Sequence, residues 1–253
     1  QILVSRFAYY GYSRMDVTLI GRFLGKEALG AYDFSMTFAS IPMQEVTGMM
    51  SKVIPGIFTT VQMHTATLRR YFLLLTELVS YLTTPMAIGL ALTADDFVLL
   101  VLGDQWEAVI TPLRILSLYM VMNAAQFLLG HVLLWTGRFR MTMYLNLFAL
   151  LVLPLGFYVG LSWGVAGVAW AWTIAFPLSI LPGVIYVGKI LELRMRDMLD
   201  ALMPALASCA LMALAVVALR WNLPPDWHHG LRLALQSVLG ATVYVVTMGL
   251  CFR

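Results

Sequence analysis

The sequence predicts an all-α protein that crosses a membrane about eight times. Of its 253 residues, 61% are hydrophobic and only 11% are charged, whereas soluble domains are about 45–50% apolar and about 25% charged. The mean hydropathy is +0.84. The apolar residues also come in repeated runs, each long enough to cross roughly 30 Å of hydrocarbon as a helix of about 20 residues. Lipid is therefore the expected solvent of this chain.

Six of the expected helices are clear apolar runs, separated by short connections that contain charge, Gly or Pro. They are expected at residues 71–94, 109–136, 141–161, 164–188, 199–220 and 231–252. Two further helices are expected at residues 2–24 and 31–62, and charged residues interrupt both. Charges within a membrane helix are costly and normally face other protein or water. These two polar helices are therefore the expected place of function.

The distribution of basic residues predicts the orientation, because short loops rich in Lys and Arg stay on the cytoplasmic side. The basic residues of one set of alternate connections are Arg69, Arg70, Arg138, Arg140, Lys189, Arg194, Arg196 and the terminal Arg253. The connection expected at residues 95–108 includes Asp95 and Asp96 and has no basic residue, which is typical of the outer face. With an even number of helices, both ends of the chain are expected in the cytoplasm.

Several classes of function are not indicated. The net charge is only +3, and the 16 Lys and Arg residues are spread between apolar runs, so nucleic acid is not an expected partner. Cys209 and Cys251 lie in apolar runs, where a thiol behaves as a small hydrophobe. His131 stands alone on an apolar helix and is expected to hydrogen-bond to a neighbouring helix. A phosphate-cradling glycine loop, a nucleophile elbow and an HExxH motif do not occur. The sequence therefore predicts no metal, no cofactor and no enzyme.

One side of the first expected helix is polar. At about 100° per residue, an arc of roughly 140° contains Arg6, Tyr9, Tyr10, Ser13 and Arg14. Asp16 lies just beyond this arc. Two interpretations stay open: the polar side faces a watery cavity, or Arg6 reaches the cytoplasmic edge of the membrane while Asp16 pairs with Arg14 or with a neighbouring helix.

Three further charged residues are candidates for a transport pathway. Glu45 and Lys52 are seven residues apart and share one face of the second expected helix. That face either lines the same cavity or is neutralised by pairing within the protein. Glu77 lies about one turn inside the third expected helix, where it either couples transport to an ion or pairs with Arg69 or Arg70.

Three stretches of the sequence resemble one known family. Residues 16–32 read DVTLIGRFLGKEALGAY, and they are followed by Pro42, Gln44, Ser51, Lys52, Pro55 and the end of the stretch at Gln62. Residues 102–108 read LGDQWEA and are followed by LRIL at residues 113–116, while residues 164–169 read GVAGVA. In this order and spacing the stretches are similar to the polysaccharide-biosynthesis branch of the multidrug/oligosaccharidyl-lipid/polysaccharide exporter superfamily, which includes the lipopolysaccharide O-antigen flippases.

The resemblance implies a larger architecture than this chain. Members have about twelve to fourteen transmembrane helices in two lobes related by a pseudo-repeat, with a site near the middle of the membrane. Residues 1–253 correspond by resemblance to the C-terminal transmembrane portion, and the N-terminal helices of the same protein would form the other wall of the cavity. The start at Gln1, without an initiator Met, agrees with this expectation.

The resemblance also implies a substrate. It is an oligosaccharide or polysaccharide unit linked to undecaprenyl pyrophosphate, flipped by alternating access from the cytoplasmic to the outer leaflet of the bacterial inner membrane. A pyrophosphate needs cationic partners in a wet cavity. The residues expected to bind the substrate are the cations Arg14, Arg6 and Lys52, with Tyr9, Tyr10 and Ser13 along the sugar path.

Two alternatives remain. A cation-coupled multidrug antiporter of the same superfamily would use Asp16, Glu45 or Glu77 as coupling carboxylates. Export of organic cations driven by a Na⁺ or H⁺ gradient would identify it. A membrane polysaccharide polymerase or ligase would need a sizeable outer loop for catalysis, whereas the expected outer connection at residues 95–108 is short and has no catalytic constellation.

Overall fold

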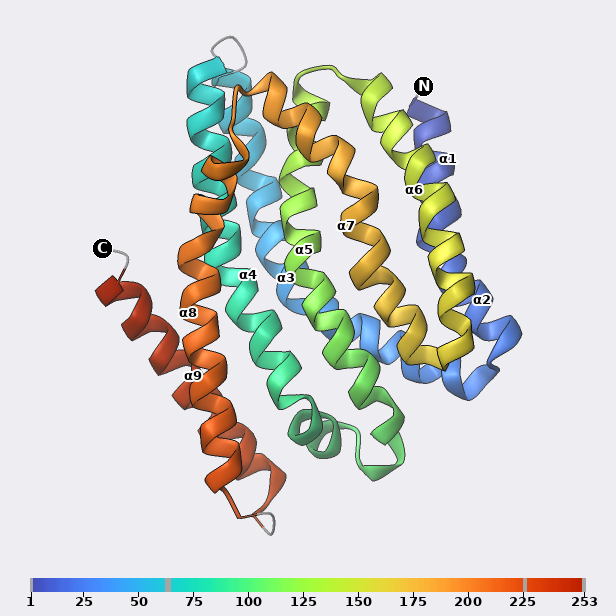
Figure 1. The fold of residues 1–253 in the computed structure, drawn as a ribbon, viewed down its shortest axis with the longest axis vertical. Coiled ribbons are helices and arrows are strands. Elements are labelled where there is room, and N and C mark those ends of the chain that lie inside the picture. The colour runs from blue at the N-terminus through green and yellow to red at the C-terminus, as the bar shows by residue number, and fades with distance from the viewer. Residues whose placement is uncertain (1, 62–64, 225–226, 252–253) are drawn as a thin grey trace.

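The computed structural model describes residues 2–61, 65–224 and 227–251, and within these ranges the chain is helical without strands (Figure 1). The α-helices are α1 (Ile2–Ser13), α2 (Met15–Phe23), α3 (Lys26–Val61), α4 (Thr65–Val101), α5 (Ile110–Trp135), α6 (Phe139–Gly160), α7 (Gly164–Ile190), α8 (Met195–Asn222) and α9 (His229–Cys251). Two short 3-10 helices are η1 (Asp104–Val109) and η2 (Leu161–Trp163). Gln1, Gln62 and Arg253 lie outside the described residues. The predicted all-α polytopic fold is confirmed.

Five helical segments of the described residues are long and apolar enough to cross a membrane. They are Ala66–Val101, Asp104–Trp135, Phe139–Ile190, Arg196–Asn222 and His229–Leu250. The third of these contains both α6 and α7, which η2 joins. The chain is therefore a multi-pass membrane protein, while the number of eight crossings stays a prediction.

The acidic stretch expected as an outer loop at residues 95–108 is mostly helical. Its first part continues α4, and η1 forms most of the remainder. Asp95 forms ion pairs with the guanidinium groups of Arg114 on α5 and Arg220 on α8. Because these neighbouring helices supply countercharges, α4 does not have to end where the acidic residues begin. The prediction that a loop starts at Asp95 was wrong.

The next residue, Asp96, connects α4 to α9 through polar contacts. Only 3% of its side chain is exposed, and its carboxylate lies 2.9 Å from Nδ1 of His229 and 2.8 Å from Nε2 of Gln236. Nε of Arg232 is 3.6 Å from the same carboxylate. All three partners belong to α9. Near this end α9 lies against α8, and its other end points away from the bundle (Figure 1).

The expected helix at residues 2–24 is two helices. The break is at Arg14, whose φ of −123° and ψ of 1° are not helical. Oδ1 of Asp16 then accepts the backbone N–H of Val17 at 2.8 Å, in the first turn of α2. The turn into α3 requires Gly25, which has a φ of +91°, a conformation that side-chain-bearing residues rarely adopt.

The glycines between α6 and α7 allow a close approach of the two helices. A Cβ atom added to Gly167 would lie 2.1 Å from the carbonyl oxygen of Gly160, and one added to Gly160 would lie 2.5 Å from the carbonyl oxygen of Gly167. Small residues let helix backbones approach in this way. Helix packing therefore explains Gly167 within the GVAGVA stretch.

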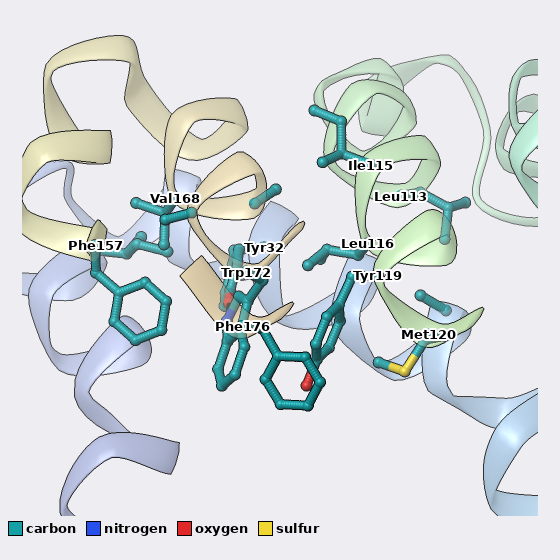
Figure 2. Close-up of a cluster of buried hydrophobic side chains, with 14 of the residues drawn as sticks. Tyr32, Leu113, Ile115, Leu116, Tyr119, Met120, Phe157, Val168, Trp172 and Phe176 are labelled. Carbon is teal, nitrogen blue, oxygen red and sulfur yellow. Dashed lines mark hydrogen bonds between the residues drawn. The ribbon is translucent and has the colours of Figure 1, made fainter. Parts of the chain in front are cut away.

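The core contains a cluster of large side chains from α3, α5, α6 and α7 (Figure 2). The ring centroid of Tyr119 is 4.9 Å from that of Trp172 and 4.9 Å from that of Phe176. The ring of Phe157 is 5.0 Å from Trp172 on another side. Tyr32 is fully buried beside them. This aromatic packing fixes the position of Trp172, which is central to the candidate site.

Candidate functional site

A groove of about 440 Å³ lies between α1, α3, α5, α6 and α7, and we call it the polar groove. Its polar and aromatic lining consists of Tyr9, Tyr12, Ser13, Tyr119, Asn123, Gln126, Phe127, His131, Thr142, Asn146, Trp172 and Phe176. The remaining described lining is Met43, Gly130 and Leu134. No Asp, Glu, Lys or Arg is among these residues. The groove therefore offers aromatic faces and neutral hydrogen-bonding groups inside an apolar bundle.

One face of α5 supplies much of the polar groove, since its lining residues recur every three or four positions. Nδ2 of Asn123 donates to the hydroxyl of Tyr119 at 2.5 Å. Nδ1 of His131 is 2.8 Å from the carbonyl oxygen of Phe127, one turn back on the same helix. The expectation that His131 bonds to a neighbouring helix was wrong, because its ring reaches this nearer carbonyl. Gln126 makes no hydrogen bond to another described residue.

Two helices on the opposite side hold each other in place. Asn146 on α6 donates through Nδ2 to the hydroxyl of Ser5 at 2.8 Å and to its carbonyl oxygen at 3.3 Å. These bonds fasten α1, which presents Tyr9 and Ser13 to the polar groove. Half of the Tyr9 side chain remains exposed.

A buried carboxylate lies behind the wall of the groove. Asp16 is 3% exposed, and its Oδ2 accepts the hydroxyl of Tyr32 at 2.6 Å and Nε1 of Trp172 at 3.1 Å. Nε1 of Trp172 also lies 2.8 Å from the Tyr32 hydroxyl. Hydrogen bonds to an ionised acceptor are the strong ones in proteins. Asp16 thus joins α2 to α3 and α7, as one interpretation expected, and it forms no ion pair with Arg14 or any other described cation.

The other residues predicted to bind substrate do not line the polar groove. Arg6, Tyr10, Arg14 and Lys52 are exposed, and none of them lines it. Arg14 occupies the break between α1 and α2. Of the six residues predicted to bind substrate, the groove brings together only Tyr9 and Ser13.

The two remaining candidate carboxylates are not paired within the described part of the chain. Glu45 is exposed and forms no ion pair with Lys52 there. Glu77 is partly exposed, and Arg69, one of its expected partners, instead pairs with Asp197 of α8 at 2.6 Å.

The sequence contained a signal for the groove residues that were missed. Asn123, Gln126 and Asn146 are amides inside apolar runs, and polar residues in membrane helices normally face protein or a wet cavity. Trp172 gave no such signal, because an indole is equally suited to a packed core. Its role depends on Asp16, which is distant in sequence.

These features define the class of the protein: a multi-pass helical membrane protein with a polar groove enclosed by its helices. Comparison with known proteins narrows this class. Residues 1–111 match the family described as "Polysaccharide biosynthesis protein". The predicted resemblance to the polysaccharide-biosynthesis branch is thereby confirmed. No solved structure matches the chain.

Three bacterial relatives extend the similarity. The chain is 26% identical to the teichuronic acid biosynthesis protein TuaB of Bacillus subtilis, over 92% of this chain and 49% of the relative. It is 24% identical to the lipopolysaccharide biosynthesis protein WzxC of Escherichia coli, over 54% of this chain and 28% of the relative. It is 35% identical to the succinoglycan biosynthesis transport protein ExoT of Rhizobium meliloti, over 40% of this chain and 21% of the relative. The chain thus matches about half the length of TuaB and a smaller share of WzxC and ExoT.

Proposed function

We propose that this chain is part of a transporter, not an enzyme, that flips a lipid-linked oligosaccharide or polysaccharide precursor across the bacterial cytoplasmic membrane by alternating access. The names of TuaB, WzxC and ExoT, which refer to polysaccharide biosynthesis or transport, support this proposal. The N-terminal helices of the same protein complete the cavity, and both ends of this chain face the cytoplasm.

The observation that carries the proposal is the exposed polar side of α1. Arg6 is exposed on α1, which packs against α6, and Arg14 is exposed at the break that follows this helix. Tyr9 and Ser13 of α1 line the polar groove. Charged side chains at membrane depth need water or protein around them. In our proposal Arg14, Arg6 and Lys52 bind the anionic pyrophosphate, while Tyr9, Tyr10 and Ser13 border the path of the saccharide.

The substitution Arg14→Ala tests this assignment in the intact protein. It removes a cation without removing any hydrogen bond of the Arg14 side chain within the described residues. We expect loss of surface polysaccharide in a complementation assay, with normal protein level and normal insertion into the membrane.

Arg196→Ala is the matched control, because this arginine is 87% exposed and lies at the start of α8, far along the chain from the polar side of α1. It should leave complementation unchanged. Full complementation by the Arg14→Ala variant would remove Arg14 from the substrate site.

Coupling to an ion gradient belongs to the same proposal. Asp16, Glu45 and Glu77 are its candidate carboxylates, and Asp16 is supported best because it is buried and touches the wall of the groove through Trp172. Gradient-driven export of organic cations in place of saccharide would support the antiporter alternative instead.

A further inference from the structure

We infer that the polar groove is a subsite for uncharged sugar rings, separate from the cations that hold the pyrophosphate. This inference rests on the proposed function and assigns one part of the substrate to one part of the chain. It follows from three properties of the groove: its charge, its aromatic surfaces and its free hydrogen-bonding groups.

The charge of the groove excludes the phosphate part of the substrate. Its described lining contains no Lys or Arg, and His131 is its one ionisable nitrogen base. A phosphate withdrawn from water into an apolar bundle needs cationic or multiple N–H partners. Behind the wall, Trp172 donates a hydrogen bond to the carboxyl group of Asp16, which supplies no cation to an anion. The polar groove therefore favours a neutral ligand over an anionic one.

The aromatic surfaces match the apolar faces of sugar rings. Tyr9 is 50% exposed and Phe127 is partly exposed, so these two lining residues have free ring surface. Tyr119, Trp172 and Phe176 also line the groove, and because each is 5% exposed or less, their rings form its packed backing (Figure 2). Their hydrogen-bonding and packing partners hold Tyr119 and Trp172 in fixed orientations. Binding sites for small molecules combine such aromatic walls with a few placed polar groups.

The free polar groups match sugar hydroxyls. Because a carbonyl oxygen only accepts hydrogen bonds, the contact with Phe127 places the proton of the neutral His131 ring on Nδ1, which leaves Nε2 as an acceptor. The Gln126 amide has no hydrogen-bond partner in the described chain and offers both donors and an acceptor. A hydroxyl group donates and accepts, so the hydroxyls of a saccharide match the hydrogen-bonding needs of both side chains.

The volume agrees with this ligand class. At about 440 Å³ the groove falls within the range of roughly 300–1,000 Å³ that is usual for small-molecule sites. It is lined from five helices, with residues between Tyr9 of α1 and Phe176 of α7.

Equilibrium binding to the purified intact protein in lipid nanodiscs tests the inference. The probes are the neutral tetrasaccharides maltotetraose, cellotetraose and mannotetraose, with tetragalacturonate and inorganic pyrophosphate as anionic probes. We expect at least one neutral probe to bind in the millimolar range or tighter. Gln126→Ala and His131→Ala should each weaken that binding about tenfold.

Matched variants separate the subsite from other effects. Leu155→Ala changes a residue of α6 that is 66% exposed and outside the groove, and it should leave binding unchanged. Compared with His131→Ala, His131→Gln restores a hydrogen-bond acceptor and should recover part of the affinity for the neutral probe. Both His131 variants should elute like the parent protein in size-exclusion chromatography.

Three results would overturn the subsite: no neutral probe binds, the groove substitutions leave binding unchanged, or pyrophosphate competes with the neutral probe. Each differs from failure of the proposed function. If Arg14→Ala keeps full complementation while neutral sugars still bind through Gln126, the phosphate assignment falls and the sugar subsite stands. If Arg14→Ala loses complementation but no neutral sugar binds, the phosphate assignment stands and the sugar subsite falls.

Discussion

The hydroxyl of Tyr32 donates a hydrogen bond of 2.6 Å to Oδ2 of Asp16, and this contact joins α2 to α3 within the helical bundle. Both residues are almost completely buried. The two helices are otherwise connected through the turn at Gly25. The Asp16–Tyr32 pair therefore fixes the angle at which the chain enters α3.

Removal of the Tyr32 hydroxyl should destabilise the fold. Tyr32→Phe deletes a donor to a buried carboxylate, which costs about 1.5–3 kcal/mol for hydrogen bonds to charged groups. Thermal unfolding in detergent micelles should show a clear fall of the midpoint. Tyr158→Phe is the control, since Tyr158 is 63% exposed and should give no shift. Equal midpoints for both variants would show that the Asp16 contact contributes nothing to stability.

Neutralisation of Asp16 should affect coupling more than folding. Asp16→Asn keeps the size of the side chain, and its one oxygen can still accept from Tyr32 and Trp172. The amide nitrogen gives up only the bond from the Val17 backbone N–H, and the group can no longer ionise. We expect transport that no longer responds to an imposed H⁺ or Na⁺ gradient, with at least a tenfold lower rate under a gradient. Asp33→Asn, on the exposed side of α3, should retain the response. A normal response of the Asp16→Asn variant would exclude this carboxylate from coupling.

A methyl group between α6 and α7 should force these helices apart. The Cβ of Gly167→Ala would lie 2.1 Å from the carbonyl oxygen of Gly160, and backbone atoms cannot move aside as a flexible side chain can. Overpacking of this kind costs about 1–3 kcal/mol. The unfolding midpoint should drop, whereas Gly48→Ala, with nothing within 4 Å of the new Cβ, should be neutral or slightly stabilising. A tolerated Gly167→Ala would mean that the two helices are not held at this spacing.

Loss of the Asp96 carboxylate should release α9. Asp96→Ala leaves Arg232, whose side chain is only 15% exposed, without its acidic partner. An uncompensated buried charge costs about 3–5 kcal/mol. Limited proteolysis should therefore cut between α8 and α9 faster than in the parent protein. Asp200→Ala removes only an exposed pair with Arg196 and should leave the cleavage rate unchanged. Identical rates for Asp96→Ala and the parent would contradict the anchoring role of Asp96.

The sequence predicted the helical elements well where apolar runs were long, because hydrocarbon thickness sets a minimum length for each helix. It was less informative where charges interrupt the pattern. No proline or glycine marks the break at Arg14, which arises where Asp16 turns inward to Tyr32 and Trp172. Similarly, α4 continues through Asp95 because Arg114 and Arg220 neutralise it from other helices.

The candidate site was only partly predictable for a related reason. Helical phase identified the polar side of α1, including Tyr9 and Ser13, from local spacing alone. Which polar residues of other helices converge on that side depends on how the helices pack. Gln126 and Asn146 are ordinary amides in their own segments, and only the arrangement of α1, α5 and α6 brings them to one groove.

The break at Arg14 has a mechanical consequence. α1 is tied to α6 through Ser5 and Asn146, whereas α2 is tied to α3 and α7 through Asp16. The segment at residues 2–23 is therefore tied to two different parts of the helical bundle, on either side of Arg14. We expect a tilt of α6 relative to α3 to bend the chain at Arg14 and to carry Tyr9 and Ser13 with α1, which would change the width of the polar groove.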